Sequence, residues 1–146
     1  MSFFNSIDIA GSGLTASRLR MDTISENIAN VETTRTEEGG AYRRKVVVYQ
    51  SVNGETFKDK LYRKMQTDEQ VAGVMVAEIA EDPSDMKMVY DPTHPDANEE
   101  GYVEMPNVDQ TQEILDMMSA SRAYQLNLSA IDISKQMAAK AIEIGR

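Results

Sequence analysis

Both ends of the chain carry apolar residues at alternating steps of three and four, and this pattern constrains the fold more than any other. The N-terminal series comprises Phe3, Ile7, Ala10, Leu14, Met21, Ile24, Ile28 and Val31, with Ser17 as its single polar member. The C-terminal series comprises Ile114, Met117, Tyr124, Leu128, Ile131, Ala138 and Ile142, interrupted by Ser121 and Lys135. Such spacing places side chains along one seam of a helix, as in coiled coils. The sequence therefore predicts a long helix at each end.

The middle of the chain has the composition of short strands. Strands are predicted at 42–52 and 71–79, which are rich in β-branched residues, and a small strand at 86–90. The pair Asn53-Gly54 is typical of a tight hairpin turn. Residues 57–65 fit a strand or a short helix, and the sequence leaves that choice open. The expected fold class is α+β.

The expected organisation has three regions, with helical ends at 1–36 and 108–146 and a small β-rich middle at 37–107. The first helix is predicted from Asn5, which begins a motif similar to a capping box, to Asn30. Within it, Gly11-Ser12-Gly13 indicates either a bend or a close approach of another backbone.

The last helix is predicted at 109–144, beginning at a capping Asp109 and ending before Gly145. At 1.5 Å per residue it would be roughly 54 Å long, too long for a domain of this size to cover on all sides. Two arrangements remain: each seam packs on the other within the chain as a helical hairpin, or partners cover the seams. The length of the last helix and the placement of both seams at the chain ends favour partners.

Composition excludes several classes of function. The net charge is −9 and is concentrated in the middle region, which holds fifteen acidic and eight basic residues. An acidic chain does not suit a nucleic-acid partner, and the basic cluster Arg43-Arg44-Lys45 is interpreted as a solvated strand edge. The chain has no cysteine, and we find neither a cleavable signal peptide nor a segment suited to direct membrane insertion.

No constellation of residues predicts catalysis, a cofactor or a metal site, and the chain is not expected to be an enzyme. His94 is the single histidine, and the carboxylates around it do not match the spacing of a calcium-binding loop. The segment 81–101, which has three prolines and seven acidic residues, is interpreted as an extended, hydrated loop. An alternative function is an extracytoplasmic acidic binding module with helical arms, either without a metal or linked to one through His94.

Specific motifs add a resemblance. The segments Asn5–Ile9, Ser12–Leu14 and Ser25–Thr33 resemble the N-terminal signature of bacterial flagellar rod and hook proteins. The proline–histidine block Tyr90–Asn98, with Gly101–Val108, Ser119–Tyr124 and the tail Lys140–Arg146, is similar to the proximal-rod members of that family. The family usually has asparagine and alanine where this chain has Glu26 and Val31.

This resemblance implies a structural subunit of the proximal rod of the flagellar basal body, in the periplasm. The subunit would be exported by the flagellar export apparatus without a cleaved signal peptide, and it would transmit torque and enclose the export channel. Its expected partners are other copies of itself, other rod proteins and the protein that joins the rod to the membrane ring.

In such a rod, the terminal helices would form the inner coiled-coil tube and the middle region would lie outside it. The ends of a free subunit are therefore expected to be largely disordered. The expected assembly-interface residues are Ile7, Leu14, Met21, Ile24, Asn27, Ile28, Asn30, Ile114, Met117, Tyr124, Leu128, Ile131, Ala138 and Ile142.

Overall fold

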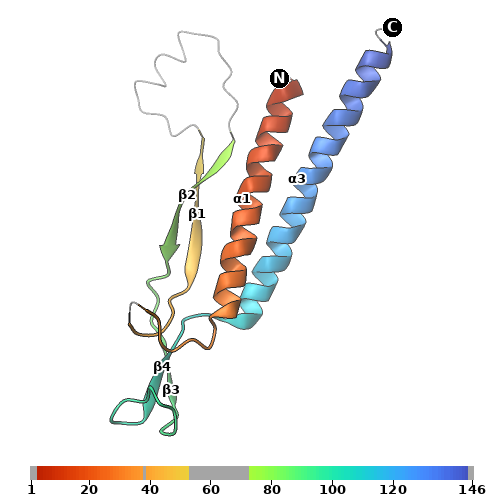
Figure 1. Ribbon diagram of the computed structural model, residues 1–146. Coiled ribbons are helices and arrows are strands. Elements are labelled where there is room, and N and C mark those ends of the chain that lie inside the picture. The colour runs from red at the N-terminus through yellow and green to blue at the C-terminus, as the bar shows by residue number, and fades with distance from the viewer. Residues whose placement is uncertain (1–2, 38, 53–72, 145–146) are drawn as a thin grey trace, which may run out of the picture.

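The structure is a computed structural model that describes residues 3–37, 39–52 and 73–144. Two long helices run antiparallel, and a two-stranded antiparallel ribbon lies along one of them (Figure 1). A separate pair of strands forms a β-hairpin that projects beyond the base of the helices, the end where the first helix ends and the last one begins. The predicted α+β class is confirmed. In chain order the elements are α1 (Phe3–Ala29), β1 (Lys45–Ser51), β2 (Val74–Glu81), β3 (Lys87–Tyr90), β4 (Tyr102–Met105) and α3 (Gln110–Ile144).

Helix α1 differs from the prediction at its start. It begins at Phe3, so Asn5 lies inside the helix and the predicted cap at that residue is wrong. Asparagine caps a helix only where the preceding backbone leaves helical geometry, and here Phe3 and Phe4 are already helical. The helix continues through Gly11 and Gly13 without interruption.

Helix α3 begins as predicted. The Asp109 carboxylate accepts hydrogen bonds from the backbone N–H groups of Thr111, at 2.9 Å, and Gln112, at 3.1 Å. These are two of the N–H groups that lack partners at a helix start, so Asp109 is a true N-cap. At 1.5 Å per residue, the 35 residues of α3 extend about 52 Å, against about 40 Å for the 27 residues of α1.

The two helices pack on each other with a regular register. The Ser6 and Ser134 hydroxyls lie 3.5 Å apart, and Asn27 donates to Glu113 at 3.1 Å near the opposite end. Between them, a Cβ added at Gly13 would lie 2.8 Å from the Asn127 amide nitrogen. These pairs are spaced by seven or fourteen residues on both helices, which is the repeat of an antiparallel coiled coil. The two helices therefore pack on each other within one chain, as in the hairpin arrangement, although the residues in these three pairs are not members of the predicted apolar series.

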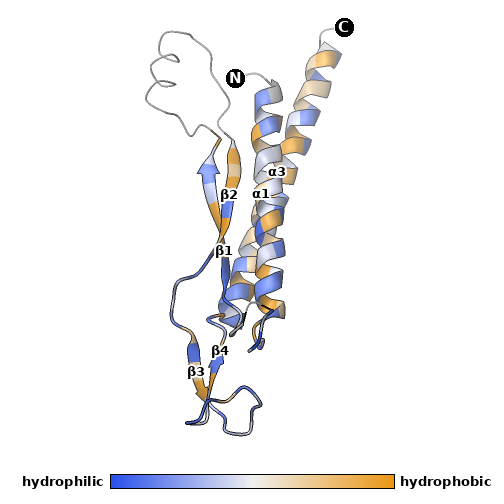
Figure 2. Cartoon of the chain, turned by 60° about the vertical axis from the view of Figure 1, so that its left-hand side comes forward, coloured by the Kyte–Doolittle hydropathy of each residue, from blue (hydrophilic) through white to orange (hydrophobic). Residues whose placement is uncertain are grey.

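Small residues let other parts of the chain approach α1 on two sides. The sequence left open whether Gly11-Ser12-Gly13 marks a bend or a close approach. Gly13 faces α3, and its missing side chain allows the close approach of α3. On the other side, the Ser12 hydroxyl accepts a hydrogen bond of 3.1 Å from the N–H of Val74, at the start of β2. Helix α1 thus lies between α3 and the β1–β2 ribbon (Figures 1 and 2).

The β1–β2 ribbon is antiparallel, with a register shift between Val48 and Tyr49. Both of its strands lie within the segments predicted from sequence, except that β2 continues two residues further, to Glu81. The predicted turn at Asn53-Gly54 and the undecided segment 57–65 lie outside the described residues.

The acidic segment is a second hairpin rather than an extended loop. The predicted small strand is confirmed as β3, but it pairs with β4, which the sequence analysis did not identify. Gly101 has a φ of 84°, a left-handed conformation that lets the chain turn back into β4. The Asn98 side-chain oxygen also accepts a hydrogen bond of 2.8 Å from the N–H of Tyr102. The expectation of an extended loop is therefore wrong.

Among the residues that the structure describes, the buried apolar core is small and consists of seven residues. Many large apolar side chains lie at the surface instead, on both pairs of strands and along α3. Figure 2 colours the strongly hydrophobic residues of these elements orange. In the part of the chain that the structure describes, neither helix has an apolar stretch that could cross a membrane. The buried apolar residues are Ala10, Ala16, Ile24, Tyr42, Val103, Val108 and Ala120.

Candidate assembly interface

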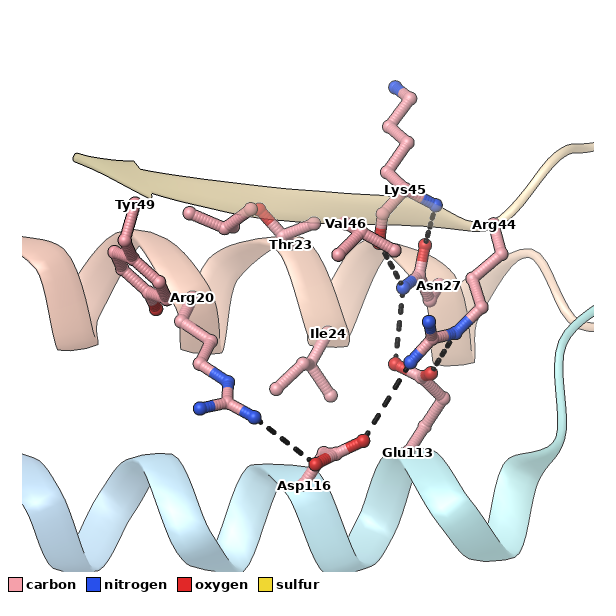
Figure 3. Close-up of a pocket in the computed structure, with 11 residues that line it drawn as sticks. Arg20, Thr23, Ile24, Asn27, Arg44, Lys45, Val46, Tyr49, Glu113 and Asp116 are labelled. Atoms are coloured by element: carbon pink, nitrogen blue, oxygen red, sulfur yellow. Dashed lines mark hydrogen bonds and ion pairs between the residues drawn. The ribbon is translucent and has the colours of Figure 1, made fainter. Parts of the chain in front are cut away.

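A buried polar junction joins the two helices to β1 near the point where α1 ends and α3 begins (Figure 3). At its centre Asn27, only 1% exposed, donates to the Lys45 carbonyl at 2.9 Å and to Glu113 at 3.1 Å. Its side-chain oxygen accepts from the Lys45 N–H and the Tyr42 hydroxyl, both at 2.9 Å. These four bonds use the full hydrogen-bonding capacity of an asparagine amide. Asn27 therefore fixes the start of β1 against both helices.

Glu113 is fully buried and is compensated by Arg44. The Arg44 Nε donates to the Glu113 carboxylate at 2.7 Å, and the guanidinium also lies 3.5 Å from Asp82 and 3.7 Å from Asp116. Burial alone would lower the pKa of Arg44, but hydrogen bonds and charge from Glu113 and Asp82 raise it above its ordinary value. A buried carboxylate is stable only when paired in this way, so Arg44 and Glu113 depend on each other.

Tyr42 lies in the same junction and is held in its neutral form. Burial, followed by the negative charges of Glu26 and Glu113, raises the pKa of the Tyr42 phenol to about 12. A neutral hydroxyl is what the site requires, because it donates to the Asn27 oxygen.

A small pocket of about 160 Å³ opens between β1 and the helices beside this junction. Its charged lining groups are already paired with one another or with a neighbour; for example, Arg20 binds Asp116 at 3.1 Å. A ligand or metal would have to displace these pairs, and the geometry therefore indicates a structural joint.

Sequence reasoning missed most of this joint. The solvated strand edge predicted for Arg43-Arg44-Lys45 is wrong for Arg44, because its side chain is only 23% exposed and reaches into the junction. Arg43, its neighbour, is exposed. Because successive residues of an extended chain point to opposite sides, one residue of a basic cluster can be buried beside exposed ones. The buried Glu113, one residue before Ile114 in the apolar series, carried no signal that distinguished it from a surface residue.

The segment before α3 is tied to the same joint by Asn107. Its side-chain oxygen accepts a 2.8 Å bond from the Arg44 N–H, and its amide donates to the Asp82 carbonyl at 3.2 Å and the Ser84 hydroxyl at 2.9 Å. The second hairpin is thereby attached to the base of the helices.

The structure distributes the expected interface residues among three environments. Ile24 and Asn27 are buried within the chain, so they stabilise the subunit itself and do not face a partner. Ile114, Leu128 and Ile142 are 47%, 45% and 71% exposed. The remaining members are partly covered: Ile7, Leu14, Met21, Ile28, Asn30, Met117, Tyr124, Ile131 and Ala138.

The exposed members lie beside the contact between the helices because that contact is offset by one residue. The paired positions Ser6, Gly13 and Asn27 each precede an apolar residue, and so do Glu113 and Asn127. In an antiparallel pair, residues that follow the paired positions by one lie on the same side of both helices. We call this surface the apolar flank: Ile7, Leu14, Met21 and Ile28 on α1, and Ile114, Leu128 and Ile142 on α3.

The acidic hairpin has its own internal bonds. Asp91 accepts from the N–H and hydroxyl of Thr93, and the His94 Nδ1 accepts from the N–H of Asp96 at 3.1 Å. Within the described ranges, no three histidine or acidic side chains come together as a metal site.

Comparison with known proteins defines the class. Residues 7–35 match the family described as "Flagella basal body rod protein", and residues 99–144 match "Flagellar basal body rod FlgEFG protein C-terminal". These two segments lie mainly in α1 and α3, the helices that form the hairpin. The chain is thus one of the rod proteins of the bacterial flagellum.

Relatives of similar length narrow this class. The chain is 46% identical to the flagellar basal-body rod protein FlgC of Bacillus subtilis (strain 168), and the match covers all of both chains. It is 46% identical to FlgC of Borreliella burgdorferi, over 99% of this chain and 98% of the relative, and 38% identical to FlgC of Escherichia coli O157:H7 over all of both. The chain belongs to the FlgC family and is a structural subunit of the flagellar basal-body rod.

Proposed function

We propose that helical hairpins of this chain pack side by side, through the apolar flank, in the wall of the proximal rod. The observation that carries this proposal is the surface of α3. One side of α3 covers α1, yet large apolar residues remain exposed around the rest of the helix along its whole length. Large apolar residues exposed along a helix, beyond the side that packs within the chain, indicate a surface that a partner covers. Those exposed residues are Ile114, Leu115, Met118, Leu126, Leu128, Ile133, Met137 and Ile142.

The three regions take different places in this proposal. Regions 1–36 and 108–146 form the inner tube around the export channel, and region 37–107 lies outside it. An interface that joins different surfaces of successive copies, and does not close, generates a helical tube. The buried polar junction supports transmission of torque across the periplasm, because it fixes β1 to both helices through several short hydrogen bonds.

The partners and route follow from the same assignment. The subunit assembles with its own copies, with other rod proteins and with the protein that joins the rod to the membrane ring. It reaches the periplasm through the flagellar export apparatus without a cleaved signal peptide, and it acts as a structural element without catalysis.

Substitution of Leu128 tests the proposal. Leu128→Asp places a charge on the apolar flank at a site that is 45% exposed, so the isolated chain keeps its helix content. Burial of that unpaired charge between copies is strongly unfavourable, so we expect secretion to be retained while rod assembly and swimming are lost. Ile28→Asp, on the α1 side of the flank, should act in the same way. Leu128→Met, which keeps the apolar surface, is the matched control. Normal swimming with Leu128→Asp would refute the proposal.

A further inference from the structure

The β3–β4 hairpin presents an apolar face that no other described helix or strand covers. Met88 pairs with Glu104 and Tyr90 with Tyr102, so these four side chains share one face of the hairpin. Met88, Tyr90 and Tyr102 are 58%, 63% and 40% exposed. The hairpin extends beyond the base of the helices and its strands pack on none of the other described elements (Figures 1 and 2). We call these four residues the hairpin face.

The aromatic side chains of the hairpin face are held by contacts within the hairpin. The two tyrosine rings contact edge to face, with centroids 5.3 Å apart and an interplanar angle of 66°. Gly101 lies directly against the Tyr90 ring, where an added Cβ would be 2.9 Å from a ring carbon. Aromatic side chains held in this way lose little conformational freedom on binding, and they are frequent anchors of protein interfaces.

A complementary surface lies on α3. A shallow groove of about 400 Å³ is lined by apolar side chains around one cation, and its members are Leu115, Met118, Ser119, Arg122, Ala123 and Leu126. Leu126 is 71% exposed. Among the described residues, Arg122 has no hydrogen-bond or ion-pair partner, unlike Arg20 and Arg44 in the junction.

Charge indicates which surface fits this groove. Residues 88–104 contain five carboxylates and no lysine or arginine. A tyrosine ring can cover the apolar walls and stack on a guanidinium, and a carboxylate beside it can pair with the same group. The hairpin of the same molecule points away from the helices, beyond their base (Figure 1). The occupant is therefore a second molecule.

We propose that the hairpin face of one copy docks in the α3 groove of a second copy, with Tyr90 against Leu126 and Glu104 paired with Arg122. The contact joins two different surfaces, so it can propagate from copy to copy. It rests on the proposed assembly and adds the partner surface of the hairpin, which the apolar flank does not involve.

Cysteine cross-linking tests this contact, because the chain has no cysteine of its own. Tyr90→Cys combined with Leu126→Cys, oxidised with copper phenanthroline in isolated basal bodies, should give a covalent dimer on a non-reducing gel. Tyr90→Cys with Met137→Cys is the matched control, because Met137 is 67% exposed on the same helix but lies outside the groove. Ser6→Cys with Ser134→Cys should form a disulfide within one chain and verify the oxidation. A missing Tyr90–Leu126 dimer, or one no stronger than the Met137 control, would overturn the proposal.

A charge exchange tests the pairing separately. Arg122→Glu should lower the cross-linked fraction about tenfold, because two like charges then face each other, and adding Glu104→Arg should restore it. Loss without restoration would mean that the groove binds another partner, which contradicts the proposal. If Arg122→Glu assembles normally while Leu128→Asp does not, the hairpin contact is wrong and the packing of the helices through the apolar flank stands.

Discussion

Replacing Asn27 by alanine should strongly destabilise the chain. The substitution removes four hydrogen bonds, to the two backbone groups of Lys45, the Tyr42 hydroxyl and Glu113. Each buried polar group left without a partner costs about 1–3 kcal/mol. Glu113 keeps Arg44, and water can enter from the adjacent pocket of about 160 Å³, so the full sum is not reached. We expect a loss of about 3–5 kcal/mol in the free energy of unfolding.

The assay is urea unfolding of the full chain followed by circular dichroism at 222 nm, with Asn30→Ala as the matched control. Asn30 is on the turn that ends α1, and its amide donates to the Glu26 carbonyl at a partly exposed position. Its replacement should cost less than about 1 kcal/mol. If the two variants lose equal stability, or Asn27→Ala loses less than about 1 kcal/mol, the junction does not fix β1 to the helices as described.

Three further predictions concern pH, the glycines and local stability. The pKa of Tyr42 is raised to about 12, so the stabilising effect of the neutral phenol is complete below pH 10 and is lost between pH 10 and 12. Tyr42→Phe should therefore reduce the fall in the free energy of unfolding over this pH range, as measured by chemical unfolding. Gly11→Ala, where nothing lies within 4 Å of the new Cβ, should raise the free energy of unfolding by about 0.5–1 kcal/mol, whereas Gly13→Ala should gain less or lose stability because it meets Asn127; equal gains would contradict the described packing. In hydrogen exchange on the free chain, amides at 5–14 and 131–143 should exchange fast and those at 24–28 slowly; strong protection throughout 1–30 would show that the ends need no partner.

The periodic signals of the sequence predicted the helices well, and they left the contact between them undetermined. Seams at steps of three and four predict which broad side of each helix is apolar. They do not determine which residues of that side form the contact between the helices. A shift of the contact by one residue rotates it by 100° around the helix axis. At Gly13 and Ser134 the small residues allow close approach, and the bulkier Leu14 and the neighbouring apolar positions are displaced to the flank.

The second hairpin and the polar junction were missed for a different physical reason. Strand β4 has only four residues, and its pairing with β3 depends on the turn that Gly101 and Asn98 form between them. The bond between Arg44 and Glu113 joins residues 69 positions apart, and no local pattern carries such a relation. Asn27 was identified, but only through family resemblance, and its buried role became visible with its partners.

The distribution of strong bonds along the two helices has a mechanical consequence. Ionic contacts and buried amide bonds are concentrated where α1 ends and α3 begins, whereas toward the termini the contact is made by hydroxyls and small side chains. Two helices fixed to each other at one end can change their separation at the other end at low energetic cost. The distance between the two chain ends can therefore follow the local curvature of the surroundings while the polar junction stays intact.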